Sequence, residues 1–147
     1  MTPATRSTTE DQIRALLDER VQAVHDRDAR ALTSACAPDI VSFDALPPLR
    51  RLGAAAVRAR AEDWLGLYDG PVDYEMRDLR IIAGEDTAFA SFLNRVSGTM
   101  TNGAAVDMWL RSTLCLRQSD GAWVIVHEHT SVPFDAESGQ AALDLAP

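Results

Sequence analysis

The chain has 147 residues, of which 46% are hydrophobic and 24% are charged, and its formal net charge is −8. This length allows one domain with its own core, and the composition excludes a disordered, collagen-like or repeat protein. An acidic chain repels phosphate backbones, so we expect no nucleic acid as a partner. No apolar run reaches the roughly 18–20 residues that span a membrane, and residues 1–7 lack the apolar stretch of a secretory signal. We therefore expect a single cytoplasmic domain over residues 1–147, with an ordered core of about 8–134 and no membrane partner.

Helical periodicity marks the first half of the chain. Apolar residues recur at three-and-four spacing after two overlapping capping boxes, Ser7 with Glu10 and Thr9 with Gln12, which predicts a helix over residues 10–27. A second, shorter helix follows residue 28 through residue 36 and ends before a proline at 38. A third helix opens at Gly53 and stops before the Asp-Gly-Pro sequence at residues 69–71.

Strands and turns make up most of the remainder. A short β-type run at residues 40–43 precedes a loop with paired prolines, and four long strands are predicted at 72–83, 87–100, 105–118 and 122–132. The Asn-Gly and Asp-Gly pairs between the later strands are strong hairpin signals. Helices that are segregated from an antiparallel meander predict an α+β fold.

This order of elements resembles the nuclear transport factor 2-like superfamily over about residues 10–133. Residues 27–39 are similar to the helix junction of that family, and residues 39–44 followed by 53–57 resemble the ketosteroid isomerase segment that ends in its general base. Residues 120–131 resemble the last hairpin of SnoaL-like proteins and of the calcium/calmodulin-dependent kinase II association domain. The resemblance implies a cone-shaped fold in which three N-terminal helices pack in a curved antiparallel sheet, and this fold hosts both enzymes and binding modules.

The alternation of side chains along each strand decides which residues line the cone. Along residues 105–118 the even positions are the more apolar, so we expect them to cover the helices. On the last strand the same parity places Val124, Val126, Glu128 and Thr130 inside. The residues that we expect to bind ligand are Arg20, Phe43, Trp64, Phe92, Asn94, Leu110, Ser112 and Thr130. Such a wall, apolar with a few polar groups, predicts a small and largely apolar organic ligand.

Asp44 and Glu128 are the two carboxylates expected to face this cavity, and both are candidate catalytic residues. The resemblance to ketosteroid isomerase implies that Asp44 is a general base, and a dry cavity, which disfavours the charged form of a carboxylate, suits that role. The isomerase holds its oxyanion with a tyrosine and a protonated aspartate. Their places here fall at about Arg20 and near Thr113 or Leu114. The sequence therefore predicts a cofactor-free isomerase, cyclase or lyase with replaced oxyanion donors.

Two alternatives stay open. The lack of both oxyanion donors, together with the last hairpin, favours a non-catalytic small-molecule-binding or oligomerisation module. If the strand parity is reversed, the pocket is lined instead by Trp109, Arg111, His127 and His129. On the expected parity, Trp109, Arg111 and Trp123 lie on the outer face of the sheet, where an aromatic patch predicts a homodimer.

We expect neither a metal nor another cofactor. His127 and His129 have a spacing found in metal sites on strands, but Asp107 is the one further candidate ligand nearby, and no phosphate-binding glycine loop or flavin motif is present. Cys36 and Cys115 lie far apart in apolar surroundings, which is typical of buried thiols in a reducing compartment.

If no metal is required, dialysis against a chelator should leave the melting temperature unchanged, because no ligand would be removed from the folded state. The measurement is thermal denaturation by circular dichroism before and after dialysis. Stoichiometric zinc in protein purified without an affinity tag would contradict this expectation.

Overall fold

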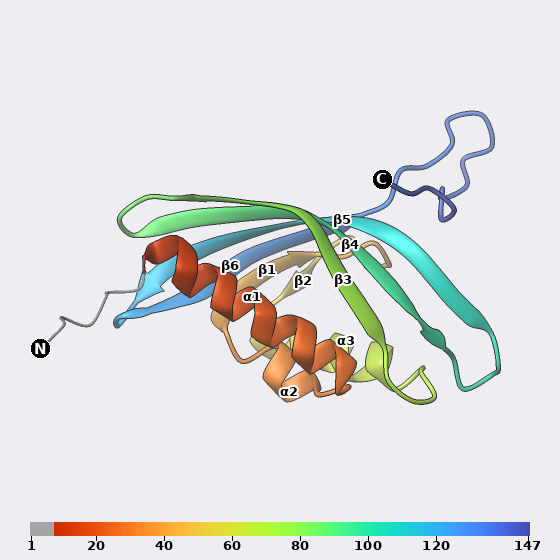
Figure 1. Ribbon diagram of the computed structural model, residues 1–147, viewed down its shortest axis with the longest axis horizontal. Helices are drawn as coiled ribbons and strands as arrows, with labels where there is room; N and C mark the ends of the chain where they lie inside the picture. The colour runs from red at the N-terminus through yellow and green to blue at the C-terminus, as the bar shows by residue number, and fades with distance from the viewer. Residues whose placement is uncertain (1–7) are drawn as a thin grey trace, which may run out of the picture.

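In the computed structural model, which describes residues 8–147, a curved six-stranded sheet arches over the helices (Figure 1). The strand order is β2 (Arg51–Leu52), β1 (Cys36–Phe43), β6 (Ala122–Ser131), β5 (Ala105–Ser119), β4 (Thr87–Thr99) and β3 (Asp73–Ala83). The predicted α+β cone is confirmed. The helix cap predicted at Ser7, and residues 1–7, which lack a secretory signal in the sequence, lie outside the described residues. Within residues 8–147, each helix is too short or too polar to cross a membrane.

The helices follow from their caps and apolar spacing. Helix α1 spans Thr9–His25 and begins with a capping box in which Thr8 accepts from the backbone of Asp11 at 3.1 Å and donates to its carboxylate at 3.2 Å. Helix α2, Ala29–Leu32, is capped by the side chain of Asp28. Helix α3, Ala54–Leu65, follows Gly53, whose φ of 90° favours glycine.

The second helix is shorter than predicted because strand β1, Cys36–Phe43, begins where the helix was expected to continue. Its pairing with β6 is interrupted between Cys36 and Val41, which leaves Pro38 at a position that needs no ladder donor. Strand β2, Arg51–Leu52, pairs with β1 at the edge of the sheet and was not predicted. A two-residue strand is too short for alternation to reveal it.

The four long strands lie within one residue of their predicted bounds: β3 Asp73–Ala83, β4 Thr87–Thr99, β5 Ala105–Ser119 and β6 Ala122–Ser131. They form an antiparallel meander, and β1 then joins β6 in parallel. The predicted parity is confirmed on β4 and β5, where the buried residues are Ala90, Phe92, Asn94, Val96, Leu110, Ser112, Leu114 and Leu116.

A β-bulge changes the parity of β6. Cys115 pairs with His127 but Leu116 pairs with Ile125, so Val126 is an extra residue. The prediction that even-numbered residues of β6 face the inside of the cone therefore holds for Glu128 and Thr130, beyond the bulge. It is wrong for Val124 and Val126.

The same bulge moves Trp123 from the predicted outer face into the core. This side chain is 6% exposed, belongs to the main apolar cluster, and donates from its ring nitrogen to Gln12 at 3.2 Å. Trp109 stays on the outer face, where the guanidinium of Arg77 lies 4.9 Å from its ring centre. The two tryptophans thus occupy opposite sides of the sheet.

A second bulge lies in β3, where Arg77 pairs with Leu93 and Arg80 with Ser91, so the β3 segment contains one more residue than the β4 segment. Asp78 has a φ of 56° there. Tyr74 and Met76 before the bulge, and Leu79 and Ile81 after it, all pack against the apolar clusters. This strand therefore contributes side chains to the cone on both sides of a change in parity.

The two tryptophans should differ in their effect on stability. Replacing Trp123 with alanine should lower the free energy of unfolding by about 3–5 kcal/mol, because it removes a buried ring, whereas the same change at Trp109 should cost about 1 kcal/mol or less, the value of an exposed cation–π contact. Urea denaturation followed by circular dichroism measures both. Equal losses would contradict the assignment of the two faces.

Candidate functional site

An ion pair crosses the interior of the cone. The guanidinium of Arg20, on α1, donates to Glu128, on β6, at 3.2 Å and to the backbone carbonyl of Leu32 at 3.1 Å. Ser42, on β1, lies 3.4 Å from the second carboxylate oxygen of Glu128. Each charged side chain is about one-fifth exposed. A pair this enclosed is stable only when its remaining polar atoms find partners, which these contacts supply.

A second polar group lies on the sheet next to this pair. The hydroxyl of Ser112 donates to the amide oxygen of Asn94 at 2.8 Å and lies 3.2 Å from the hydroxyl of Thr130. The three residues come from adjacent strands β4, β5 and β6, and Asn94 and Ser112 are buried. Predicted site residues from four elements, Arg20, Asn94, Ser112, Glu128 and Thr130, therefore face the interior on one side of the sheet.

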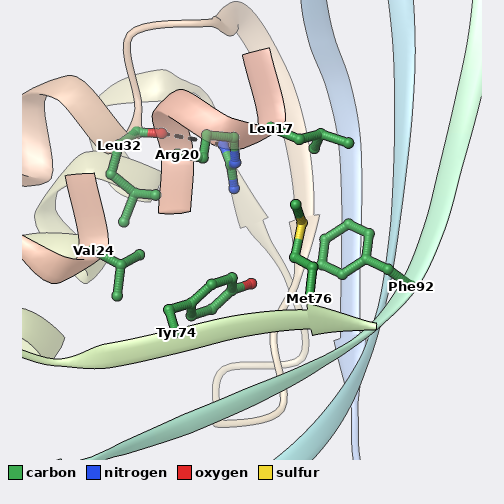
Figure 2. A pocket seen from close by; sticks show the side chains of 7 residues that line it. All are labelled: Leu17, Arg20, Val24, Leu32, Tyr74, Met76 and Phe92. Atoms are coloured by element: carbon green, nitrogen blue, oxygen red, sulfur yellow. Dashed lines mark hydrogen bonds between the residues drawn. The ribbon is translucent and has the colours of Figure 1, made fainter. Parts of the chain in front are cut away.

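A small cavity opens between α1, α2 and the sheet, with a volume of about 20 Å³. Its lining consists of Leu17, Arg20, Val24, Leu32, Tyr74, Met76 and Phe92. Figure 2 shows the guanidinium of Arg20 and the hydroxyl of Tyr74 pointing into this space from opposite sides, and no other lining residue hydrogen-bonds to that hydroxyl. The volume is enough for about one water molecule.

The charges around the cavity balance. Burial raises the pKa of the Tyr74 phenol to about 12 against the opposing effect of Arg20, so the hydroxyl stays protonated at neutral pH and can donate. Burial also works against the charge of Arg20, but Glu128, Cys36 and Tyr74 together outweigh it and raise the pKa of the guanidinium. Burial raises the pKa of the Cys36 thiol to about 11, which keeps it protonated. The interior thus holds one positive and one negative group.

Tyr74 is the polar cavity residue that was not predicted from the sequence, and the apolar lining residues Leu17, Val24, Leu32 and Met76 were not predicted as site residues either. A signal was present, because Val72, Tyr74 and Met76 share the parity that is apolar on the neighbouring strands. The charged residues between and after them, and the unseen bulge at Asp78, obscured that alternation.

Asp44 is not among the residues that line this cavity, and its carboxylate is paired with two arginines instead of facing a dry cone as expected. One carboxylate oxygen accepts from Arg60, on α3, at 2.9 Å and from Arg51, on β2, at 3.2 Å, and the other accepts from the backbone of Leu46 at 3.3 Å. Arg51 also donates to the carbonyl of Pro47 at 2.7 Å. Asp44 therefore fastens the loop at residues 45–50 to α3 and caps its own turn.

Other expected ligand contacts lie elsewhere. Phe43 is on the outer face, with its ring centre 4.8 Å from that of His127 and 5.6 Å from that of His129. Trp64 packs edge-on against Tyr68 with ring centres 6.0 Å apart. Phe92 is the exception, because it lines the cavity as expected. Leu110 lies in the neighbouring core cluster.

The residues of the reversed-parity alternative stay on the outer face. His127 is hydrogen-bonded through Nδ1 to the backbone carbonyl of Val41 at 2.8 Å, and Arg111 donates to Ser131 at 3.2 Å. Among residues 8–147, no three His, Cys, Asp or Glu side chains are grouped closely enough to hold a metal ion.

A wider hollow of about 650 Å³ lies at the surface, where the turn between α1 and α2 meets the end of α3. Its lining is mostly charged, with Asp26, Asp28, Arg30 and Glu62 among it. Arg27 is anchored there by a hydrogen bond of 2.6 Å to the carbonyl of Tyr68. The hollow is open to solvent and lacks the enclosed donors of the cone, so the cone is the candidate site.

The role of Asp44 as a fastener predicts a loss of stability in Asp44→Asn. Two arginines would lose their shared carboxylate, so the free energy of unfolding should fall by about 1–3 kcal/mol. Thermal and urea denaturation measure this, with the exposed α3 residue change Asp63→Asn as a control that should have little effect. Unchanged or increased stability would show that the pairing contributes nothing.

The comparisons with known proteins agree with this fold. A family model described as a SnoaL-like domain matches residues 13–135. A crystal structure of a nuclear transport factor 2-like protein of unknown function from Pseudomonas putida is 35% identical, with 97% of this chain and 100% of that chain covered and a TM-score of 0.85. A search of curated proteins finds no significant match.

More distant structures share the fold alone. A ketosteroid isomerase-like protein from Erwinia carotovora atroseptica is 19% identical, over 84% of this chain and 97% of that chain, with a TM-score of 0.70. A protein provisionally named as a scytalone dehydratase, from Novosphingobium aromaticivorans, is 11% identical, over 94% and 95% of the two chains, with a TM-score of 0.76. With the family match over residues 13–135, this chain belongs to the SnoaL-like family of the nuclear transport factor 2-like superfamily.

Proposed function

We propose that the chain binds a small organic molecule in the cone and holds the polar end of that molecule between Arg20 and Tyr74. The observation that carries this proposal is the pair of hydrogen-bond donors, one guanidinium and one phenol, that point into a single otherwise apolar cavity. A cavity of about 20 Å³ must widen to admit such a ligand. Met76, a flexible side chain, and Leu32, on the four-residue helix α2, are the lining groups best suited to move.

The charge balance in the cone favours a neutral ligand oxygen. Glu128 already neutralises Arg20, so a carboxylate or phosphate would bring an uncompensated charge into a poorly hydrated interior. A carbonyl oxygen accepts from both donors without that cost. The ligand class is therefore a small molecule with a ketone or similar carbonyl next to an apolar body.

A second function is favoured by the position of Glu128. Its carboxylate contacts the same guanidinium that would polarise a bound carbonyl. Glu128 would then take the proton from the carbon beside the carbonyl, and Arg20 and Tyr74 would donate to the enolate oxygen that forms. Where a carbon–carbon double bond of the ligand lies beside the deprotonated carbon, return of that proton to the far end of the double bond completes an isomerisation. In this scheme Glu128 replaces Asp44 as the base, and the names of the ketosteroid isomerase-like and dehydratase-like structures support such chemistry for this fold.

Phenylacetone and phenylacetate are a nearly isosteric pair that tests the ligand class. We expect the ketone to raise the melting temperature of the wild-type protein and to bind at least about tenfold more tightly than the acid. In Glu128→Gln the preference should reverse, because Arg20 then has a free charge. The control is Glu19→Gln, which changes an exposed residue of α1, the helix that carries Arg20. This variant should keep the wild-type preference. Failure of both compounds to bind at millimolar concentration would contradict the binding proposal.

Catalysis is tested separately by hydrogen–deuterium exchange at the benzylic carbon of phenylacetone in D₂O, followed by proton NMR. We expect the wild-type protein to accelerate exchange and Glu128→Gln to lower that rate by roughly 10²–10⁴-fold, the usual contribution of a general base. Asp44→Asn should retain exchange in proportion to its folded fraction. A protein that binds the ketone without accelerating exchange would be a binding module only.

A further inference from the structure

After β6 the chain forms a short arm, residues 133–145, which lies beyond the end of the sheet and away from the helices (Figure 1). Phe134 bridges to Ala141, and backbone hydrogen bonds of 2.8 Å run from Ala142 to Pro133 and from Asp135 to Gln140. The Asp135 carboxylate accepts from the backbone of Glu137 and the hydroxyl of Ser138. The arm therefore has a defined shape that comes from its own hydrogen bonds.

The apolar side chains of this arm are exposed. Phe134 is 70% exposed, and Leu143 and Leu145 are each about half exposed. A lone two-stranded hairpin is marginally stable in water because it has no core. Several exposed apolar side chains on one short, shaped segment favour a contact surface.

The loop at residues 45–50 and the adjoining strand β2 present a matching surface. Leu49 is 95% exposed, and Leu46 and Leu52 are more than half exposed. The contacts of Asp44 with Arg51 and Arg60 hold this loop in place, so these leucines are presented on a fixed backbone. The arm of the same chain does not cover them, since Leu49 and Phe134 are both exposed.

Charge also matches the arm to the loop. The arm carries three acidic residues, Asp135, Glu137 and Asp144, in a chain whose net charge is already −8. The loop ends in adjacent arginines, of which Arg51 is paired with Asp44 while Arg50 is exposed. An acidic arm is repelled by a mostly acidic surface and attracted to this basic site.

We propose that the arm of one copy packs on the 45–50 loop of a second copy of this chain, and that the second arm packs back on the first loop. Such a two-fold dimer buries both apolar surfaces in the same contact and uses it twice. The contact is separate from the outer-face patch of Trp109 and Arg111, and it does not depend on any ligand in the cone.

Single substitutions test the contact in the full chain. Leu49→Ser and Phe134→Ser should each weaken self-association at least about tenfold, because each removes a buried apolar side chain twice per dimer. Leu67→Ser, at a leucine after α3 that is 46% exposed, is the control and should leave association unchanged. Analytical ultracentrifugation over a concentration series measures the effect, and circular dichroism checks the fold of each variant.

A mixing experiment identifies arm and loop as partners. Leu49→Ser protein has an intact arm and Phe134→Ser protein has an intact loop, so a heterodimer regains one of the two contacts. The mixture should therefore associate more tightly than either variant alone. Arg50→Glu should weaken the dimer, and Glu137→Arg in the same chain should restore part of the loss.

Several outcomes would overturn the proposal. These are a wild-type monomer at about 100 µM, far above the micromolar Kd of ordinary specific contacts, undiminished association of both serine variants, or a mixture no tighter than its components. A dimer that dissociates with Trp109→Ser alone would assign self-association to the outer face of the sheet instead.

Discussion

The ion pair between Arg20 and Glu128 is the interaction on which the interior of this protein depends. It joins the first helix to the last strand, 108 residues apart, and reaches β1 and α2 through Ser42 and the carbonyl of Leu32. An enclosed charge pair contributes little net stability, but the loss of either member leaves an unpaired charge that is costly. Both partners are therefore held in one geometry by these contacts.

Most of the architecture could be predicted because turns and alternation are local properties of the chain. The turn sequences, among them the Asn-Gly and Asp-Gly pairs on either side of β5, predicted the bounds of the four long strands to within one residue, and even parity identified the inner faces of β4 and β5. The errors arose where pairing between strands decides the result. Val126 became an extra residue only because β5 sets the register, and Trp123 entered the core for that reason.

The site was predictable in part for the same physical reason. Glu128, Asn94, Ser112 and Thr130 followed from alternation, whereas Asp44 was assigned by resemblance to a segment of another protein. Its true partners, Arg51 and Arg60, come from an edge strand and a helix whose packing no local pattern reveals. Tyr74 was overlooked because its strand changes parity at Asp78.

The bulge at Val126 has a chemical consequence beyond geometry. If β6 paired regularly, with Val126 taking its own place in the alternation, the parity that buries Trp123 and Ile125 would continue to His127 and His129. Two imidazoles would then line the cone, and the carboxylate between them would face outward. The bulge thus determines whether the interior holds a carboxylate or a pair of imidazoles, so a related chain whose last strand kept all its residues but paired without a bulge would carry different chemistry on the same backbone.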